Sequence, residues 1–449
     1  MTADATADTL DLLHDLIRKA CAAGADAADA LLYDAASLSV SRRMGMIETL
    51  ERSESGDLGL RVFVGCRQAL VSSSDRSTEA LTSLVERAVA MARVVPEDSF
   101  CGLAEPGQLA REHPDLDSCD NTELSAEELI EQTRIGEEAA LAVPGITNSD
   151  GANAGWSRST VALAASNGFS GRYSRSHFSL SVSVLAGTGL GMERDYDYAT
   201  KVYAADLPPA ADIGRLAGER AVRRLNPRKV KSCKVPVVFD PRVSRGLLSH
   251  LSGAISGPSI ARGTSFLKDR LGQPVFAPGV TVIDDPFVRR GLRSRPFDGE
   301  GVTVRRRTII EDGQLTTWLL DLRSARQLGL TTTGHAARGT SAPPSPSPAN
   351  FYMMAGTKSP QALIGEITDG FYITEMMGMG VNSLTGDYSR GATGFWIENG
   401  EIADPVSEMT VAGNLKEMFL NLEPADDLVF RYGMDAPTVR IDGMTVAGL

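Results

Sequence analysis

The strongest constraint on the fold is a strict two-residue alternation in the segment 178–184. Its apolar residues alternate with three serines: Phe178, Leu180, Val182 and Val184 against Ser179, Ser181 and Ser183. Because successive side chains of a strand point to opposite faces, this pattern is typical of a β-strand with one buried face. Asn167-Gly168 separates two further apolar runs, 161–165 and 169–173, and this dipeptide favours a hairpin turn. The region 146–207 is therefore predicted to be rich in strands.

The rest of the first half mixes helices with short strands. A helix is predicted to begin at Ser125, because Glu128 three residues later completes a capping box. Apolar residues at helical spacing predict the other helices at 8–23, 77–94 and 210–225. Short strands are expected at 30–33, 38–42, 58–64 and 69–71, and a long polar connection at 96–122.

The second half is predicted to contain many short strands. Its first strand, 235–239, leads into a helix that has Asp240 as cap and Pro241 as first residue. Further strands are expected at 280–283, 302–307, 308–311, 371–375 and 394–398. The Pro/Ser-rich stretch 341–348 is expected to be either a flexible loop or a rigid extended one. A chain of 449 residues exceeds one typical core and suggests two or three domains. We place a boundary near 227–236 and predict the domains 1–230 and 231–449.

Composition restricts the partners and the compartment. The chain carries 45 Lys and Arg against 57 Asp and Glu residues, a formal net charge of −12. Phosphate binding needs a basic face, so this balance argues against nucleic acid as a partner. No apolar run reaches the ~18 residues of a membrane-spanning helix, and residues 1–11 lack the basic start of a secretory signal. Five scattered cysteines fit reduced thiols. We therefore predict a cytoplasmic protein without membrane or nucleic-acid partners.

Common catalytic motifs are missing. The sequence has no G-x-S-x-G, no P-loop and no close pair of histidines. A catalytic zinc site normally takes three protein ligands from His, Cys, Asp or Glu, and here no cysteine follows Cys233. The inventory disfavours a metal site, although carboxylates from distant segments remain available as ligands. The five isolated histidines are His14, His113, His177, His250 and His335.

A set of motifs, most of them in the second half, is far more specific. The main ones are MMGMGVN at 376–382, TGDYSRGA at 385–392 and GFWIENGE at 394–401. Supporting motifs are GDLGLRVF at 56–63, GTS at 263–265, IDDP at 283–286, FDGEG at 297–301, NFYM at 350–353 and PTVRIDGMTV at 437–446. Together they closely resemble the TldE (PmbA) type of the TldD/PmbA family of metallopeptidases, over essentially the whole chain.

The resemblance implies an α+β fold, with a mixed α/β N-terminal domain followed by a larger β-rich, mainly antiparallel C-terminal domain. The metal-bearing TldD subunits of this family have a His-Glu-x-x-x-His helix and a distal cysteine ligand. Aligned without gaps from the GTS motif, these three positions are Leu248, Ser249 and Gly253 in this sequence, and His250 is out of register by two. The resemblance therefore implies no catalytic residue, no metal ligand and no cofactor here, and Leu248 is expected in the core.

The function implied by the resemblance is that of a metal-free partner subunit. TldD–TldE assemblies cleave unfolded or flexible peptides, in the maturation of modified peptide antibiotics and the degradation of a labile antitoxin. The chain is expected to be inactive alone, to pair with a zinc-bearing TldD-like subunit, and to form a homodimer as an option when that partner is absent.

The loop 376–390 is the candidate for facing the substrate chamber or the subunit interface. Its candidate residues are Met379, Asn382, Asp387, Tyr388 and Arg390. A structural role is weighed equally, in which Gly378, Gly380 and Gly386 supply tight turns with positive φ and Asp387 pairs with Arg390.

Two other functions stay open at this point. One is an autonomous hydrolase that uses His250 or His335 with carboxylates such as Asp284, Asp285, Asp298 or Glu300. The other is a non-catalytic peptide-binding protein that forms homo-oligomers.

Overall fold

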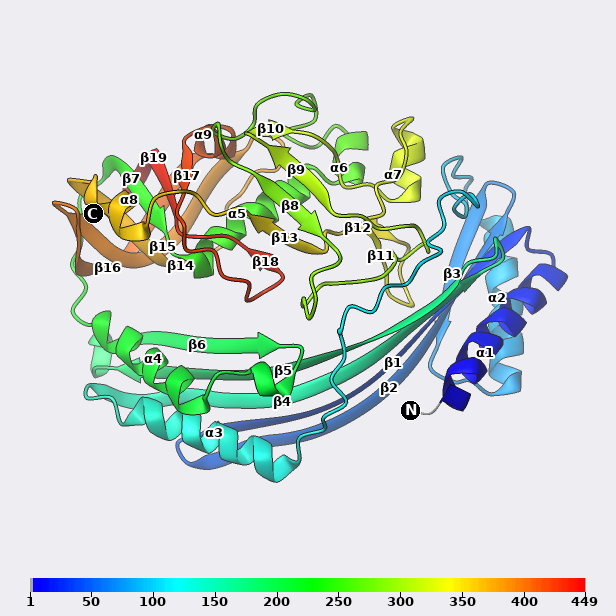
Figure 1. Ribbon diagram of the computed structural model, residues 1–449, viewed down its shortest axis with the longest axis horizontal. Coiled ribbons are helices and arrows are strands. Elements are labelled where there is room, and N and C mark those ends of the chain that lie inside the picture. The colour runs from blue at the N-terminus through cyan, green and yellow to red at the C-terminus, as the bar shows by residue number, and fades with distance from the viewer. Residues whose placement is uncertain (1–2, 449) are drawn as a thin grey trace.

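The first half of the chain builds one large sheet. In the computed structural model, which describes residues 3–448, six antiparallel strands run in the order β3-β2-β1-β4-β5-β6. Their bounds are β1 Ala27–Arg43, β2 Met46–Val64, β3 Arg67–Ser73, β4 Ile146–Ala165, β5 Ser170–Ala186 and β6 Glu193–Lys201. The sheet is long and curved, and its concave side faces the C-terminal half (Figure 1).

Four helices cover the convex side of this sheet: α1 Ala3–Ala22, α2 Thr78–Val94, α3 Ala126–Leu141 and α4 Ala210–Arg223. Side chains alternate between the two faces along β1. Ala30 and Leu32 pack into a core with α1 and α2, and Leu38 joins a core with α3 and α4. The intervening Leu31 lies on the concave face, in a cluster with Phe297 of the C-terminal half. The concave face is therefore the contact surface between the two halves.

The C-terminal half contains a barrel-like sheet and a smaller one. The larger sheet has the order β16-β15-β14-β7-β19-β17, and an added β16–β19 pairing closes five of its strands into a ring. Its bounds are β7 Cys233–Phe239, β14 Asp369–Met377, β15 Asp387–Glu398, β16 Glu401–Asn414, β17 Leu422–Pro424 and β19 Val439–Ala447. The second sheet is β8 Val282–Asp285, β9 Arg307–Glu311, β10 Gln314–Leu315, β13 Asn350–Met353 and β18 Met434–Asp435.

Short helices and a small hairpin complete this half. Helix α5, Pro241–Ala254, contributes Leu247, Leu248 and Leu251 to the main core, together with residues of both sheets. The other helices are α6 Gly257–Ala261, α7 Leu322–Gln327, α8 Pro360–Gly365 and α9 Leu415–Leu420. The strands β11 Ala336–Ala337 and β12 Ser345–Pro346 form the hairpin. Within residues 3–448 no helix is long and apolar enough to cross a membrane.

The predicted fold class is confirmed: a mixed α/β first half precedes a strand-rich, mainly antiparallel second half. The capping box is present, since the Ser125 side chain accepts from the Glu128 N–H while Glu128 accepts from the Ser125 N–H. Asp240 caps α5, as predicted, by accepting from the Arg242 N–H. The predicted boundary at 230 and 231 falls between α4 and β7 and stays a prediction.

Two predictions of strands are wrong. The strands expected at 30–33 and 38–42 are one strand, β1, because β2 and β4 pair with it continuously from both sides. No strand occupies 302–306. There the backbone bonds instead to the linker after α2: the Thr303 N–H donates to the Gln108 carbonyl, and the Ala110 N–H to that of Gly301. Both errors come from pairing partners far away in the sequence.

Candidate functional site

The candidate loop 376–390 is a compact turn between β14 and β15. It closes on itself, since the Ser389 N–H donates to the Gly380 carbonyl at 2.7 Å and the Asn382 N–H to the Asp387 carbonyl at 2.9 Å. It is also attached to its surroundings, because the Phe266 N–H donates to the Ser383 carbonyl. The loop is thus a hydrogen-bonded turn with a defined shape.

Two of the candidate polar residues stabilise this turn. The Asn382 side-chain oxygen accepts from the Leu384 N–H at 2.9 Å. The Asp387 carboxylate accepts from the Thr385 hydroxyl at 2.6 Å and from the Asn414 amide at 3.0 Å, and these hydrogen bonds lower the pKa of Asp387. Both side chains are therefore engaged within the loop and its neighbour β16.

The ion pair expected between Asp387 and Arg390 does not form, because each side chain bonds elsewhere. Arg390 Nε donates to the carbonyl of Gly378 at 2.9 Å. The glycine interpretation holds for Gly378 and Gly386, whose φ angles are 79° and 87°. It fails for Gly380, whose φ is not positive; there a Cβ would lie 1.9 Å from the Ser389 carbonyl oxygen, so close approach is the reason for glycine.

Tyr388 and His250 meet beneath the loop. The Tyr388 side chain belongs to the main core and is only 3% exposed. Its ring stands edge-on to that of His250 on α5, with centroids 5.8 Å apart. Burial lowers the pKa of His250, and the positive charge of Arg390 lowers it further. Burial raises the pKa of Tyr388 to about 12, although Arg390 opposes this. Near neutral pH the rings of His250 and Tyr388 are therefore both uncharged, and the positively charged Arg390 lies close to them.

Exposure separates the five candidates. Met379 is 94% exposed and Arg390 is half-buried, whereas Tyr388 is a core residue and Asn382 and Asp387 shape the turn. The sequence analysis missed the contact between His250 and Tyr388, because no local pattern joins a helix to a strand 138 residues later. The roles of the five residues in a chamber or interface stay a prediction.

Helix α5 carries no metal ligand on the aligned positions. Leu248 lies in the core, as predicted. Ser249 and Gly253 are exposed, and a Cβ on Gly253 would meet nothing within 4 Å. Across residues 3–448 no group of three or more His, Cys, Asp or Glu side chains is gathered as a metal site requires. The zinc set of the TldD type does not fit these residues.

The residues considered for an autonomous hydrolase lie in different surroundings. His335 contacts Asp284, with 3.2 Å between Nε2 and Oδ2, but both side chains are buried. The other Asp284 oxygen accepts from the Ala349 N–H at 2.6 Å. Burial lowers the pKa of His335. The His335–Asp284 pair is thus shielded from substrate, and His250 contacts Tyr388 instead.

The nearby carboxylates accept hydrogen bonds from backbone N–H groups. Asp298 accepts from the N–H groups of Glu300 and Val302, both at 2.9 Å. Glu300 accepts from the Leu322 N–H at 2.9 Å. Burial raises the pKa of Asp298 to about 6 and that of Glu300 to about 8. Asp285 accepts from the Phe287 N–H.

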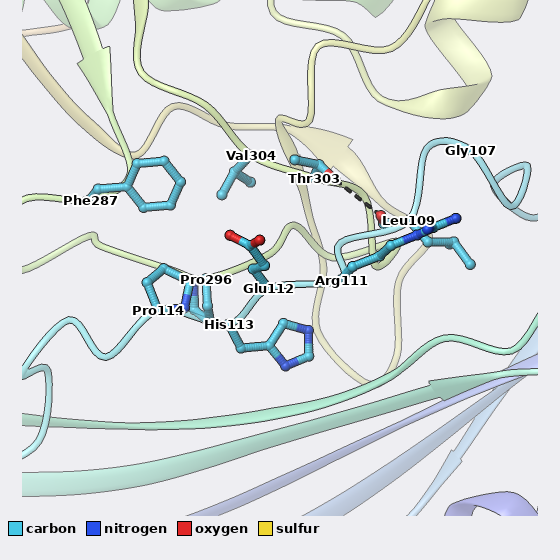
Figure 2. A pocket seen from close by; sticks show the side chains of 10 residues that line it. All are labelled: Gly107, Leu109, Arg111, Glu112, His113, Pro114, Phe287, Pro296, Thr303 and Val304. Carbon is cyan, nitrogen blue, oxygen red and sulfur yellow. Dashed lines mark hydrogen bonds between the residues drawn. The ribbon is translucent and has the colours of Figure 1, made fainter.

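A cavity that no sequence pattern pointed to opens beside the linker that follows α2. It measures about 790 Å³ and lies between residues 107–114 and loops of the C-terminal half. Figure 2 shows the Glu112 carboxylate pointing toward Phe287 and Val304. Thr303 donates to the Leu109 carbonyl at 3.1 Å and ties the two walls together (Figure 2). The lining combines the polar side chains of Arg111, Glu112 and His113 with apolar ones such as those of Phe287 and Val304, a mixture that is typical of ligand-binding cavities.

Comparisons with known proteins cover nearly the whole chain. Models of the PmbA/TldA metallopeptidases match residues 28–92 (domain 1), 119–225 (central domain) and 232–448 (C-terminal domain). The metalloprotease PmbA of Escherichia coli O157:H7 is 39% identical over 425 residues, 94% of this chain and 92% of that protein. A crystal structure from Bacteroides thetaiotaomicron is 30% identical, with a TM-score of 0.90 over 98% of each chain. TldE from Thermococcus kodakarensis has the same fold, with a TM-score of 0.87 at 22% identity over 97% of this chain and 100% of that one.

Proposed function

Because the chain belongs to the PmbA/TldD family of metallopeptidases, we propose that it is the metal-free partner subunit of a two-subunit TldD–TldE type peptidase. In such an assembly a TldD-like subunit holds the zinc and cuts flexible peptides in the cytoplasm. This chain completes the chamber, and is inactive alone. Where the partner is missing, a homodimer is the alternative assembly.

The observation that carries this proposal is the face of α5. Its aligned positions present Leu248 to the core and Ser249 and Gly253 to solvent. None of these three supplies a nitrogen, oxygen or sulfur donor strong enough to replace a histidine ligand or a glutamate base. These residues support our proposal that the other subunit holds the catalytic metal of the assembly.

A free strand edge supports association with another chain. Residues 46–57 of β2 pair with β1 on one side only, because β3 covers just residues 58–64. Residues 46–55 of this open stretch are exposed, including the apolar residues Met46 and Leu50, and residues 56 and 57 are half-buried. Unpaired N–H and C=O groups on such an edge are a template for a strand of another chain.

The test measures metal content and activity on the same sample. The purified chain is analysed for zinc by mass spectrometry, and peptidase activity is followed alone and after adding a metal-bearing TldD-type subunit. We expect substoichiometric zinc, no turnover alone and turnover on mixing. About one tightly held zinc per chain, together with turnover alone, would contradict the proposal.

The candidate loop is tested in the same mixture. Met379→Glu places a charge on a side chain that is exposed in the isolated chain, so folding should not change while activity in the mixture falls. Met91→Glu, on the exposed face of α2, is the matched control and should leave activity unchanged. Equal activity of the two variants would assign the loop a purely structural role.

A further inference from the structure

A second cavity lies between the two halves of the chain. It measures about 310 Å³, at the lower end of the range for small-ligand sites. One wall is the concave face of the first sheet, and the other is formed by the loop 295–299 and the segment 336–340. Its lining includes three arginines and three aromatic side chains: Arg175, Arg295, Arg338, Tyr33, Tyr173 and Phe297.

Two of these guanidinium groups lack a carboxylate partner in the part of the chain that the structure describes. Arg175 donates to the Tyr173 hydroxyl at 3.2 Å and lies 4.8 Å from the centre of that ring. Arg295, which is buried, donates to the carbonyl of Ser347 at 2.7 Å. Neither contact neutralises the charge of the guanidinium group, and Asp298 in the same lining is the carboxylate whose charge acts on Arg295.

The carboxylates at this cavity are already engaged. Asp298 is the one acidic residue in the described lining, and its oxygens accept from backbone N–H groups, including that of Ala336 at 3.1 Å. Asp29 lies behind the wall and accepts from Arg338 Nη1 at 2.6 Å. Burial lowers the pKa of the neighbouring Arg293, and the positive charge of Arg295 adds to this effect. The cavity therefore has an excess of positive charge.

Several N–H donors of these arginines have no acceptor among the described residues. They are Nε of Arg175, Nε of Arg295, and both Nε and Nη2 of Arg338. A buried donor left unpaired is destabilising, so these groups favour an acceptor that enters the cavity. Nε and Nη2 form one edge of the guanidinium, and such an edge holds a carboxylate through two parallel hydrogen bonds. The Arg338 side chain is 1% exposed and is fixed from its other side by Asp29.

The cavity has an entrance and an apolar lining. Tyr33 is 38% exposed and Gly339 is exposed, so both mark the side that is open to solvent. Tyr173 and Phe297 contact each other edge-to-face with centroids 5.3 Å apart. An anionic group entering past Tyr33 would meet guanidinium groups inside and aromatic surface around them.

We propose that this cavity binds a carboxylate group of a peptide, either its C-terminus or an acidic side chain. The arginines supply charge and paired donors for the planar carboxylate, and the aromatic rings contact the adjoining apolar part of the peptide. That the carboxylate comes from a peptide rests on the function proposed above; the anion site itself stands on the geometry alone.

The test titrates three peptides into the isolated chain by calorimetry. The first is an N-acetylated peptide without acidic residues and with a free C-terminus; the second is the same peptide as C-terminal amide; the third is that amide with one internal glutamate. We expect at least one carboxylate peptide to bind about tenfold or more tighter than the neutral amide, a difference of about 1.4 kcal/mol. The first and third peptides show which carboxylate the site prefers. Equal affinity for all three overturns the proposal.

Variants locate the binding. Arg175→Gln and Arg295→Gln should each lower the affinity for the preferred peptide about tenfold, whereas Arg87→Gln, exposed on α2, should not change it. Unchanged affinity in both cavity variants would place the site elsewhere. Arg175 is half-buried, so its variant keeps the test usable if Arg295→Gln does not fold.

Competition identifies the anion without any variant. Sodium acetate should displace the peptide from the unaltered chain more effectively than sodium chloride at equal ionic strength. Displacement by inorganic phosphate but not by acetate would overturn a carboxylate site. Because binding is measured without a partner subunit, a chain that binds the carboxylate but does not activate a TldD-type subunit refutes the proposed function and leaves this site in place.

Discussion

Asp29 lies where the first sheet meets the C-terminal half, and its carboxylate accepts from two buried guanidinium groups. Arg61 donates to it from Nε at 3.0 Å, and Arg338 from Nη1 at 2.6 Å. All three side chains are almost completely buried. Asp29→Asn keeps the size of the side chain but removes the one carboxylate that pairs with Arg338 among the described residues; Arg61 retains Glu300, 3.6 Å away. Removing one partner of a buried pair costs about 3–5 kcal/mol, so we expect a loss of that size in the free energy of unfolding.

The assay is guanidinium chloride denaturation near neutral pH, followed by tryptophan fluorescence. Trp156 reports on the first sheet, and Trp396 reports on the barrel-like sheet. The matched control is Glu54→Gln, because Glu54 pairs with Arg52 at the surface; there we expect a change of less than about 1 kcal/mol. A loss below about 1 kcal/mol for Asp29→Asn would refute the argument that this charge is required by its two partners.

The pH dependence of the same variant has a definite sign. Burial alone raises the pKa of Asp29, but Arg338 and Arg61 outweigh it and hold the pKa below its usual range. A lowered pKa stabilises the fold above the unfolded pKa of about 3.9, and this stabilisation is lost as the pH falls through the folded value. The difference between the two proteins should therefore stay constant from about pH 6 to 8. A steady decline across that range would contradict the assignment.

Three further predictions concern α5 and the loop beside it. Leu248→Ala should lower the free energy of unfolding by about 2–5 kcal/mol, because it opens a cavity in the core, whereas Ser249→Ala at the surface should change it by less than about 0.5 kcal/mol; denaturant titration checks both. Gly380→Ala should destabilise the chain, since its Cβ would lie 1.9 Å from a carbonyl oxygen. Gly253→Ala, whose Cβ would meet nothing within 4 Å, should instead stabilise the helix by about 0.5–1 kcal/mol. Thermal melts of both variants check this. Burial and Arg390 lower the pKa of His250, so the wild type should lose stability relative to His250→Gln as the pH falls below the unfolded value of about 6.5; parallel pH profiles would contradict this.

Elements whose pattern lies within a few residues are predictable from the sequence. Strand β5 contains the alternation 178–184, and its apolar members lie in the core with α3 and α4. The cap of α3 follows from Ser125 and Glu128 alone. The outer half of β2, 46–57, is mostly polar and exposed up to residue 55, so no alternating burial pattern marks it. It is a strand because β1 supplies its hydrogen bonds.

The candidate site shows the same limit. Tight turns at Gly378 and Gly386 follow from the glycines themselves, and α5 begins where its cap and proline place it. Asp387 accepts a hydrogen bond from Asn414 at the far end of β16, and His250 makes its ring contact with Tyr388 on β15. These contacts are set by the packing of strands, which a pattern of nearby residues does not encode.

The Pro/Ser-rich stretch 341–348 completes a hairpin whose first part, 336–340, lines the cavity between the two halves. Sequence composition left open whether residues 341–348 are flexible or extended; in the structure β12 pairs with β11, and Ser347 accepts from Arg295. The same hairpin brings Arg338 onto β1, 309 residues from Asp29 in the sequence. Gly59 of β2 gives the hairpin room, since a Cβ there would lie 2.3 Å from the Thr340 carbonyl oxygen. This hairpin thus supplies Arg338 to the contact between the halves, and its Ser347 carbonyl holds Arg295 in place. The charge that stabilises the contact and the charge that would bind a peptide carboxylate therefore depend on the same hairpin.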